Sequence, residues 1–230
     1  MTRWGTGVLE RLPLTGNETV LDAGCGSGRV TEQLLERLPH GRVIAADAAP
    51  SMLVEARGRL ARFGDRVGFL ECDLGHPLPV EPPVDAVLSS ATFHWVADHD
   101  ALFRNLAGVL RPGGPLVAQC GGAGNIASVR QAVAELGDDW DGPWTFATPE
   151  ETAARLERAG FVDVETWLHD EPTPIEPGKP METYLATVIL RAHLDRLPET
   201  DRAGFVRRVA GRLPSSEIDY VRLNIVARRA

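Results

Sequence analysis

Apolar and polar residues alternate in blocks through the first half of the chain. Between residues 19 and 122, short and almost wholly apolar runs are separated by longer stretches whose apolar residues recur every three or four positions. This pattern is typical of parallel strands that are buried on both faces and joined by amphipathic helices. The predicted strands are Thr19–Asp22, Arg42–Asp47, Val67–Glu71, Val84–Ser89 and Leu116–Gly121. The predicted helices between them are Val30–Leu38, Pro50–Arg62 and Asp100–Leu110.

The alternation fades beyond Gly122, where helices become the main prediction. A loop that contains Trp140 and Trp144 is expected before Thr148, and Thr148 is a suitable N-cap for the next helix. A proline-rich connector is expected ahead of the last two helices. The helical pattern covers Asn125–Leu136, the segment from Thr148 to Ala159, Met181–Arg196 and Glu199–Arg212, and the strand pattern covers Phe161–Leu168 and Ile218–Arg228.

Composition and charge narrow the class of protein. The chain has 230 residues, of which 43% are hydrophobic and 24% charged, and this composition fits one globular domain. A formal net charge of −8 argues against an extended nucleic-acid surface. No apolar run reaches the roughly 20 residues that a membrane span requires, and Met1–Trp4 does not begin a signal peptide. The cysteines Cys25, Cys72 and Cys120 lack the spacing of metal ligands or of a redox pair. We therefore expect a cytoplasmic monomer or homodimer that binds neither nucleic acid nor membrane.

The strongest chemical signal is the glycine-rich segment Val20–Gly28 (VLDAGCGSG), which follows the first predicted strand. Its glycines allow a tight turn and a close approach of the backbone to a ligand, and the next helix presents free N–H groups. A dinucleotide fingerprint would place a third glycine where Arg29 stands. The carboxylate of Asp22 suits a cationic ligand, such as the ammonium group of an amino acid, better than it suits a diphosphate. The segment therefore favours a cofactor with an amino acid part over NAD.

Two more acidic residues follow the next strands of the predicted sheet. Asp47 ends the second strand, where a carboxylate can accept hydrogen bonds from both hydroxyls of a ribose. The alternative is that Asp47 caps the helix that begins near Pro50. Asp73 follows the third strand and precedes Leu74, and this pair can bind the edge and face of an adenine; the alternative is a solvated turn. Together with the glycine-rich segment, these acids indicate a nucleoside site.

These segments, and Leu110–Gly114 before the fifth strand, resemble the class I S-adenosylmethionine-dependent methyltransferases over about residues 19–122. Ala91–Val96 and Phe146–Phe161 are similar to the trans-aconitate methyltransferase branch and its small-molecule relatives. The resemblance implies a Rossmann-like α/β fold. In that fold a seven-stranded, mostly parallel sheet has helices on both faces and a helical lid from the C-terminal half. The strand inserted antiparallel would be Ile218–Arg228.

The resemblance also implies a domain organisation and a set of cofactor contacts. Residues 1–230 would form one methyltransferase domain, with a cofactor-binding core at about residues 15–122 and lid and substrate-side elements at about 123–160 and 172–215. Only 18 residues precede Thr19, fewer than is usual in the family, so the cover over the cofactor would be short or would come from elsewhere.

The roles that the resemblance assigns follow the chemistry of the cofactor. Asp22 would hold the ammonium group, Asp47 the ribose hydroxyls and Asp73 the adenine amino group. The full set for S-adenosylmethionine is Asp22, Gly24, Cys25, Gly26, Asp47, Ala48, Met52, Asp73, Leu74, Ser89 and Ser90.

The acceptor is expected beyond the fourth strand, at Ser89–Val96, because open α/β sheets bind ligands outside the carboxyl ends of their strands. His94 is the candidate general base, and the alternatives are a hydrogen-bonded structural histidine and a binding group. Trp95 and Trp144 are the substrate-side candidates; the alternatives are an anchor for the next helix and an apolar seam under the lid. No group of ligands with usable spacing predicts a metal site.

We predict that the protein transfers a methyl group from S-adenosylmethionine to a small-molecule acceptor, at the oxygen of a carboxylate or a hydroxyl. Transfer from a sulfonium is an in-line displacement, so the protein mainly positions the acceptor and excludes water. A carboxylate needs no base, whereas a hydroxyl would profit from His94. The alternatives are a C- or N-methyltransferase of specialised metabolism and a non-catalytic cofactor-binding regulatory module.

Overall fold

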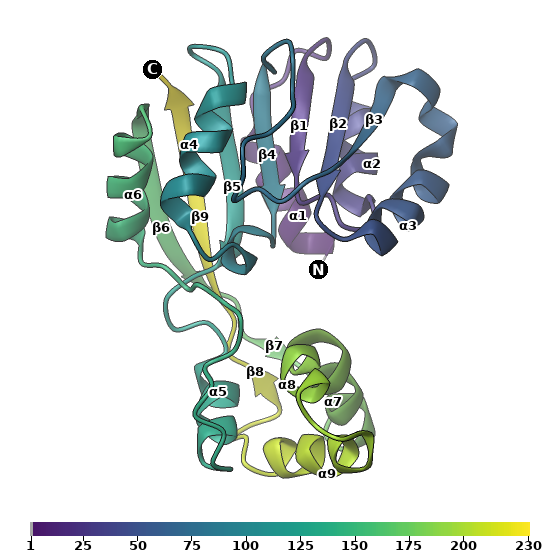
Figure 1. Ribbon diagram of the computed structural model, residues 1–230, viewed down its shortest axis with the longest axis vertical. Coiled ribbons are helices and arrows are strands. Elements are labelled where there is room, and N and C mark those ends of the chain that lie inside the picture. The colour runs from purple at the N-terminus through teal and green to yellow at the C-terminus, as the bar shows by residue number, and fades with distance from the viewer. Residues whose placement is uncertain (1) are drawn as a thin grey trace.

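The computed structural model describes residues 2–230, and a seven-stranded sheet is its central feature (Figure 1). The strand order is β3-β2-β1-β4-β5-β9-β6; β1 to β5 run parallel, and β9 is antiparallel to both of its neighbours. The order reverses between β1 and β4, and such a switch point is where open α/β sheets bind ligands. The predicted Rossmann-like α/β class is confirmed. The strands are β1 (Thr19–Ala23), β2 (Arg42–Asp47), β3 (Val67–Glu71), β4 (Ala86–Ser90), β5 (Pro115–Gly121), β6 (Phe161–Asp170) and β9 (Val221–Arg229).

Helices cover both faces of this sheet (Figure 1). On one face lie α1 (Thr2–Arg11), α2 (Arg29–Arg37) and α3 (Pro50–Leu60), whose leucines form one apolar core with the strands. On the other face lie α4 (His99–Val109) and α6 (Pro149–Arg158), which pack against a second core. Alternate residues of the strands belong to the two cores, as expected for strands buried on both faces. No helix within residues 2–230 has the length and apolar character to cross a bilayer.

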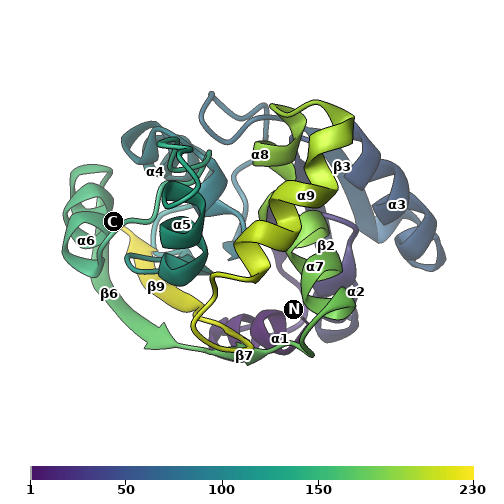
Figure 2. The same ribbon diagram turned by 90° about the horizontal axis from the view of Figure 1, so that it is seen from below.

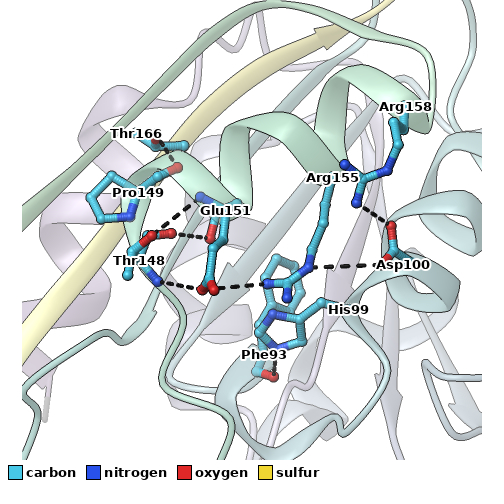
Figure 3. Close-up of polar contacts among 10 residues, drawn as sticks. Phe93, His99, Asp100, Thr148, Pro149, Glu151, Arg155, Arg158 and Thr166 are labelled. Atoms are coloured by element: carbon cyan, nitrogen blue, oxygen red, sulfur yellow. Dashed lines mark hydrogen bonds and ion pairs between the residues drawn. The ribbon is translucent and has the colours of Figure 1, made fainter.

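Polar contacts fix α6 on the sheet and against α4 (Figure 3). Thr148 Oγ1 accepts a hydrogen bond from Glu151 N, and the Glu151 carboxylate accepts one from Thr148 N, both at 3.2 Å. This reciprocal pair is a capping box, so the predicted N-cap is confirmed. Arg158 donates to Asp100 of α4 at 2.7 Å.

The C-terminal helices form a separate layer beyond the carboxyl edge of the parallel strands (Figures 1 and 2). Apolar residues of these helices make a third core, together with residues that flank β8. A two-stranded ribbon of β7 (Thr173–Pro174) and β8 (Glu217–Ile218) lies between this layer and the sheet. We call this layer the lid; its helices are α5 (Ala127–Ala134), α7 (Lys179–Tyr184), the π-helix Leu185–Ile189, α8 (Arg191–Asp195) and α9 (Glu199–Ala210).

Three sequence expectations need correction. The predicted helix Met181–Arg196 is interrupted, because Leu190 N donates to Leu185 O at 2.7 Å and closes a π-turn between α7 and α8. The predicted strand Ile218–Arg228 is also divided: Ile218 pairs in the ribbon, and the sheet strand starts at Val221. Val84 forms only an isolated bridge, so β4 begins at Ala86.

Helix α1 has no counterpart in the sequence prediction. Gly5 and Gly7 lower its intrinsic helix propensity, so the pattern alone is weak. Burial of Val8 and Leu9 against the sheet stabilises it instead. A Cβ at Gly5 would collide with Val30, so glycine permits the close approach of α1 to α2. The residues before Thr19 therefore contain a packed helix.

Candidate active site

A cleft of about 610 Å³ opens at the carboxyl edge of the sheet, where β1 to β4 end. Segments that immediately follow each of these four strands line it. Most of the residues predicted to bind a cofactor lie on its wall: Gly24, Cys25, Gly26, Asp47, Ala48, Met52, Asp73, Leu74 and Ser90. Asp22 and Ser89 are buried beneath the cleft and do not line it. Ser89 Oγ donates to Ala23 O at 2.6 Å and so joins β4 to β1.

The loop after β1 is held in a tight turn by its own backbone. Gly24 and Gly26 have φ values of 89° and 53°, a region that favours glycine. A Cβ at Gly24 would collide with Thr92 of the loop after β4. Gly24 N and Cys25 N both donate to Ala46 O at 2.8 Å, which fastens the loop to β2. Glycine at position 24 therefore lets the loop after β1 pack directly against the loop after β4, and both loops line the cleft.

Asp47 connects two walls of the cleft. Its Oδ2 accepts a hydrogen bond from Gly26 N at 2.8 Å, and its Oδ1 accepts one from Ala49 N at 2.9 Å. Ala49 is the N-cap residue of α3 and no side chain caps that helix, so Asp47 stabilises the turn ahead of α3 and is not its helix cap. An ionised carboxylate has about four acceptor sites, so Asp47 keeps capacity for ribose hydroxyls in the cleft.

Asp22 is 1% exposed and accepts a hydrogen bond from Thr31 Oγ1 at 2.6 Å. Burial is the main cause that raises the pKa of Asp22 to about 6; the charge of Asp47 adds to the rise, and the Thr31 hydrogen bond opposes it. The carboxylate is therefore sensitive to charge near the glycine-rich loop. A cation bound in the cleft would favour its ionised form.

Asp73 lines the cleft from the segment after β3 and is mostly exposed. It accepts a hydrogen bond from Gly75 N at 2.8 Å, and its Oδ2 lies 3.5 Å from His76 Nδ1. Asp73 thus stabilises a solvated turn, the alternative considered from the sequence, and it also lines the cleft. Leu74 beside it is buried.

A smaller pocket of about 130 Å³ adjoins the cleft on the side of the lid. Ala91 and Trp95 line both spaces, so they mark the junction between them. The other residues around the pocket come from the sheet edge and the lid: His94, Ile126, Trp144, Val188, Ile189, Tyr220 and Arg222. Trp95 is half exposed, and its ring centroid lies 6.1 Å from that of Trp144.

Tyr220 and Arg222 are polar pocket residues that the sequence analysis missed, as it also missed the apolar Ile126, Val188 and Ile189. Arg222 is 2% exposed and stands in β9 opposite Gly121 of β5. An arginine side chain remains protonated in proteins, although burial lowers the pKa of Arg222. The Tyr220 and Tyr184 hydroxyls lie 2.8 Å apart, and burial together with this contact raises the pKa of Tyr220. A charged residue inside an apolar strand pattern was the signal available for Arg222.

His94 is buried between aromatic rings. Its ring centroid is 5.2 Å from that of Trp95 and 5.9 Å from that of Phe146. Gly121 N donates to His94 Nδ1 at 3.2 Å, which places the proton of the neutral ring on Nε2. Burial, with the charge of Arg222 as a further cause, lowers the pKa of His94 to about 3. The ring is therefore a neutral group at physiological pH, and its low basicity argues against general-base catalysis.

Another buried histidine near this site is not part of the pocket wall. His99, the first residue of α4, has its Nε2 3.0 Å from Phe93 O (Figure 3). Within residues 2–230, no three histidine, cysteine or acidic side chains are grouped so that they could hold a metal ion.

Comparison with known proteins places this geometry in a family. The profile of the methyltransferase domain family matches residues 20–114. A trans-aconitate 2-methyltransferase of Methylobacterium radiotolerans is 30% identical and aligns with 100% of this chain and 94% of its own. The corresponding protein of Paracidovorax citrulli is 30% identical over 89% of this chain and 81% of its own.

Solved structures agree on the fold. Phosphoethanolamine N-methyltransferase 2 of Haemonchus contortus, in complex with S-adenosyl-L-methionine, superposes with a TM-score of 0.66 at 20% identity. The superposition covers 99% of this chain and 52% of that one. The chain therefore belongs to the class I S-adenosylmethionine-dependent methyltransferases, in their trans-aconitate methyltransferase branch, and transfers a methyl group from that cofactor to a small-molecule acceptor.

Proposed function

We propose that this enzyme methylates a carboxylate oxygen of a small organic acid, which binds in the pocket next to the cofactor cleft. The observation that carries the proposal is the buried guanidinium of Arg222 on the wall of that pocket. A buried cation favours an anionic ligand, because charge-assisted hydrogen bonds to it are strong. The full-length relatives are named for methylation of trans-aconitate, which is a carboxylic acid.

The large cleft suits S-adenosylmethionine, the cofactor of this family. When bound, the cofactor would supply a methyl group attached to a positively charged sulfur. As the acceptor oxygen bonds to the methyl carbon, the carbon–sulfur bond would break and leave the sulfur as a neutral thioether. We propose that Asp22 favours the ammonium group through its charge and that Gly24, Cys25 and Gly26 pass beneath the methionine part. Asp47 would accept hydrogen bonds from the ribose hydroxyls.

The adenine would occupy the opposite end of the cleft. We propose that the adenine lies between Asp73 and Leu74 on one side and Ala48 and Met52 on the other, since all four residues line the cleft. Ser90 lines the cleft near the junction, whereas Ser89 supports the strand below it.

The acceptor needs orientation more than it needs a base, because a carboxylate is already ionised and nucleophilic at neutral pH. We propose that neutral His94 positions the acceptor and that Trp95 and Trp144 exclude water from it. An amine acceptor fits less well, since any protonated form would be repelled by Arg222.

We further propose that residues 1–230 work as one methyltransferase domain, in the cytoplasm and as a monomer or homodimer. The core at about residues 15–122 would hold the cofactor, and the lid and substrate-side elements at about 123–160 and 172–215 would complete the acceptor site. Lid residues such as Ile126, Trp144 and Val188 on the pocket wall support this division of labour.

Transfer of labelled methyl groups to a panel of small carboxylic acids, each paired with its primary amide, tests the proposal. We expect labelled product from one or more acids and none from the matching amides. Transfer to amides or amines, or absence of transfer to every acid by protein that binds the cofactor in calorimetry, would contradict carboxylate methylation.

A further inference from the structure

The acceptor pocket has a distinctive charge inventory. Its described wall contains one arginine and no lysine, aspartate or glutamate. His94 does not add a second cation, since burial keeps its ring neutral. The pocket therefore offers a single positive charge, at Arg222, together with the hydroxyl of Tyr220.

Arg222 lines the acceptor pocket but not the cofactor cleft. Ser90 and Ala91, at the end of β4, line the cleft, whereas Arg222 belongs to β9, two strands further along the sheet. Adjacent strands are about 4.8 Å apart, so the backbone of Arg222 is roughly 10 Å from that of β4. Because Arg222 lines only the pocket, whereas Ala91 and Trp95 line both spaces, we expect a group held by Arg222 to be separate from the group that reacts at the junction.

The remaining wall of the pocket is apolar. Val188 and Ile189 reach it from the π-helix Leu185–Ile189, and Ile126 reaches it from the loop before α5. Single π-turns are rare and occur often at functional sites, because the extra residue redirects side chains. This turn places two branched aliphatic side chains on the pocket wall.

We infer that the acceptor is a dicarboxylate with a short apolar spacer; this inference rests on the proposed carboxylate methylation. One carboxylate would react at the junction, where the bound cofactor contributes the nearest positive charge. The second would bind the guanidinium of Arg222 and the hydroxyl of Tyr220. The spacer would lie against Val188 and Ile189.

Charge matching separates this class of acceptor from its neighbours. A tricarboxylate such as trans-aconitate would bury a third charge against the apolar wall, and an unpaired buried charge is strongly unfavourable. A monocarboxylate that reacts at the junction would gain no charge-assisted hydrogen bond from Arg222. The inference thus predicts a selectivity that differs from the activity after which the relatives are named.

A matched acid series on the unmodified enzyme tests this selectivity. We would compare kcat/KM for methylsuccinate and glutarate, for monocarboxylates in which a methyl replaces one carboxyl, and for trans-aconitate. We expect the best dicarboxylate to exceed both other classes by about tenfold or more, with a monomethyl ester as the product. Equal or faster methylation of a monocarboxylate or of trans-aconitate would overturn the inference.

Variants of β9 assign the selectivity to its proposed cause. Arg222→Met should lower kcat/KM for the dicarboxylate by about a hundredfold and change the monocarboxylate rate little, because only the dicarboxylate loses an ionic partner. Arg222→Lys should restore part of the loss. Arg228→Met is the matched control, because Arg228 is an exposed arginine of the same strand, away from the pocket.

Binding gives a second readout that does not depend on turnover. With S-adenosylhomocysteine present, calorimetry should show dicarboxylate binding that Arg222→Met weakens and Arg228→Met leaves unchanged. Equal loss for mono- and dicarboxylates would overturn the inference. If no acid of any charge is methylated, the proposed function itself fails and the inference falls with it; a preference for another acid class overturns the inference alone. The acid series decides the matter even if Arg222→Met does not fold.

Discussion

The cofactor cleft and the acceptor pocket are built in different ways. The cleft is lined by short contiguous segments, each of which directly follows a parallel strand. The pocket collects single residues from the sheet edge, the lid loop, a π-helix and an antiparallel strand, spread between Ala91 and Arg222. The first site is therefore encoded in local motifs, whereas the second exists only once the lid has packed.

The difference extends to how each site is stabilised. The loop after β1 is held by backbone hydrogen bonds to β2 and by Asp47. The acceptor pocket depends on the third apolar core, to which Ile126, Trp144 and Ile189 belong. Changes in the cleft should therefore alter cofactor affinity, and changes in the pocket should alter acceptor kinetics, with little crossover between the two.

The largest expected effect in the cleft is that of Asp47→Ala. The change removes the proposed ribose contacts and also the support of Gly26 N and Ala49 N. We expect S-adenosylmethionine and S-adenosylhomocysteine both to bind more weakly by about 1–3 kcal/mol. Calorimetry measures this, and Asp47→Asn, which keeps one acceptor oxygen, should lie between the two proteins. Undiminished affinity would show that Asp47 acts only as a support for the backbone of these two loops.

The next effect concerns pH and the buried carboxylate of Asp22. The pKa of Asp22 in the free protein is about 6, and the ammonium group favours the ionised form. Affinity should therefore be full above that pH and fall as the pH drops through 6, by about tenfold between pH 7 and pH 5. In Asp22→Asn, cofactor affinity should be low and independent of pH. A pH dependence that persists in the variant would assign it to another group.

A smaller effect is expected on the acceptor side, for His94→Gln. If His94 only positions a carboxylate, the change should lower the single-turnover rate by about tenfold or less, near 1.4 kcal/mol. Because burial keeps the pKa of His94 at about 3, the rate of the wild-type enzyme should not follow a histidine ionisation between pH 5.5 and 9. A hundredfold loss that tracks one ionisation near neutrality would point to a hydroxyl acceptor with His94 as its base.

The smallest expected effect is that of chelation. No group of three side chains suited to a metal ion occurs within residues 2–230, and neither half of the site needs one for the proposed chemistry. Treatment with EDTA should leave the kinetic constants for both the cofactor and the acceptor unchanged. Loss that only a divalent ion restores would contradict this expectation and would favour a metal-assisted hydroxyl acceptor.

The same contrast explains what could be predicted from the sequence. Buried parallel strands are short apolar runs, so β2 and β3 were predicted to the residue, and the glycine-rich loop follows β1 as expected. Helix α1 was missed because tertiary burial of Val8 and Leu9 outweighs the low helix propensity of its glycines.

Arg222 was missed for a topological reason. Ligands were expected beyond the carboxyl ends of strands, but β9 is antiparallel and presents its first residues at that edge. The π-turn that carries Val188 and Ile189 also leaves no mark in a helical pattern of apolar residues. The pocket that both features line depends on how distant segments pack, so even the unusual charge at Arg222 does not show from the sequence that it belongs to a site.

The most direct test of the central claim identifies the atom that receives the methyl group. The enzyme would be incubated with S-adenosylmethionine labelled with ¹³C in the methyl group and with the best acid acceptor, and the product treated with mild alkali. A methyl ester releases labelled methanol under these conditions, and this is the result we predict. A product that keeps its label through alkaline hydrolysis, as an ether, N-methyl or C-methyl compound would, contradicts methylation of a carboxylate.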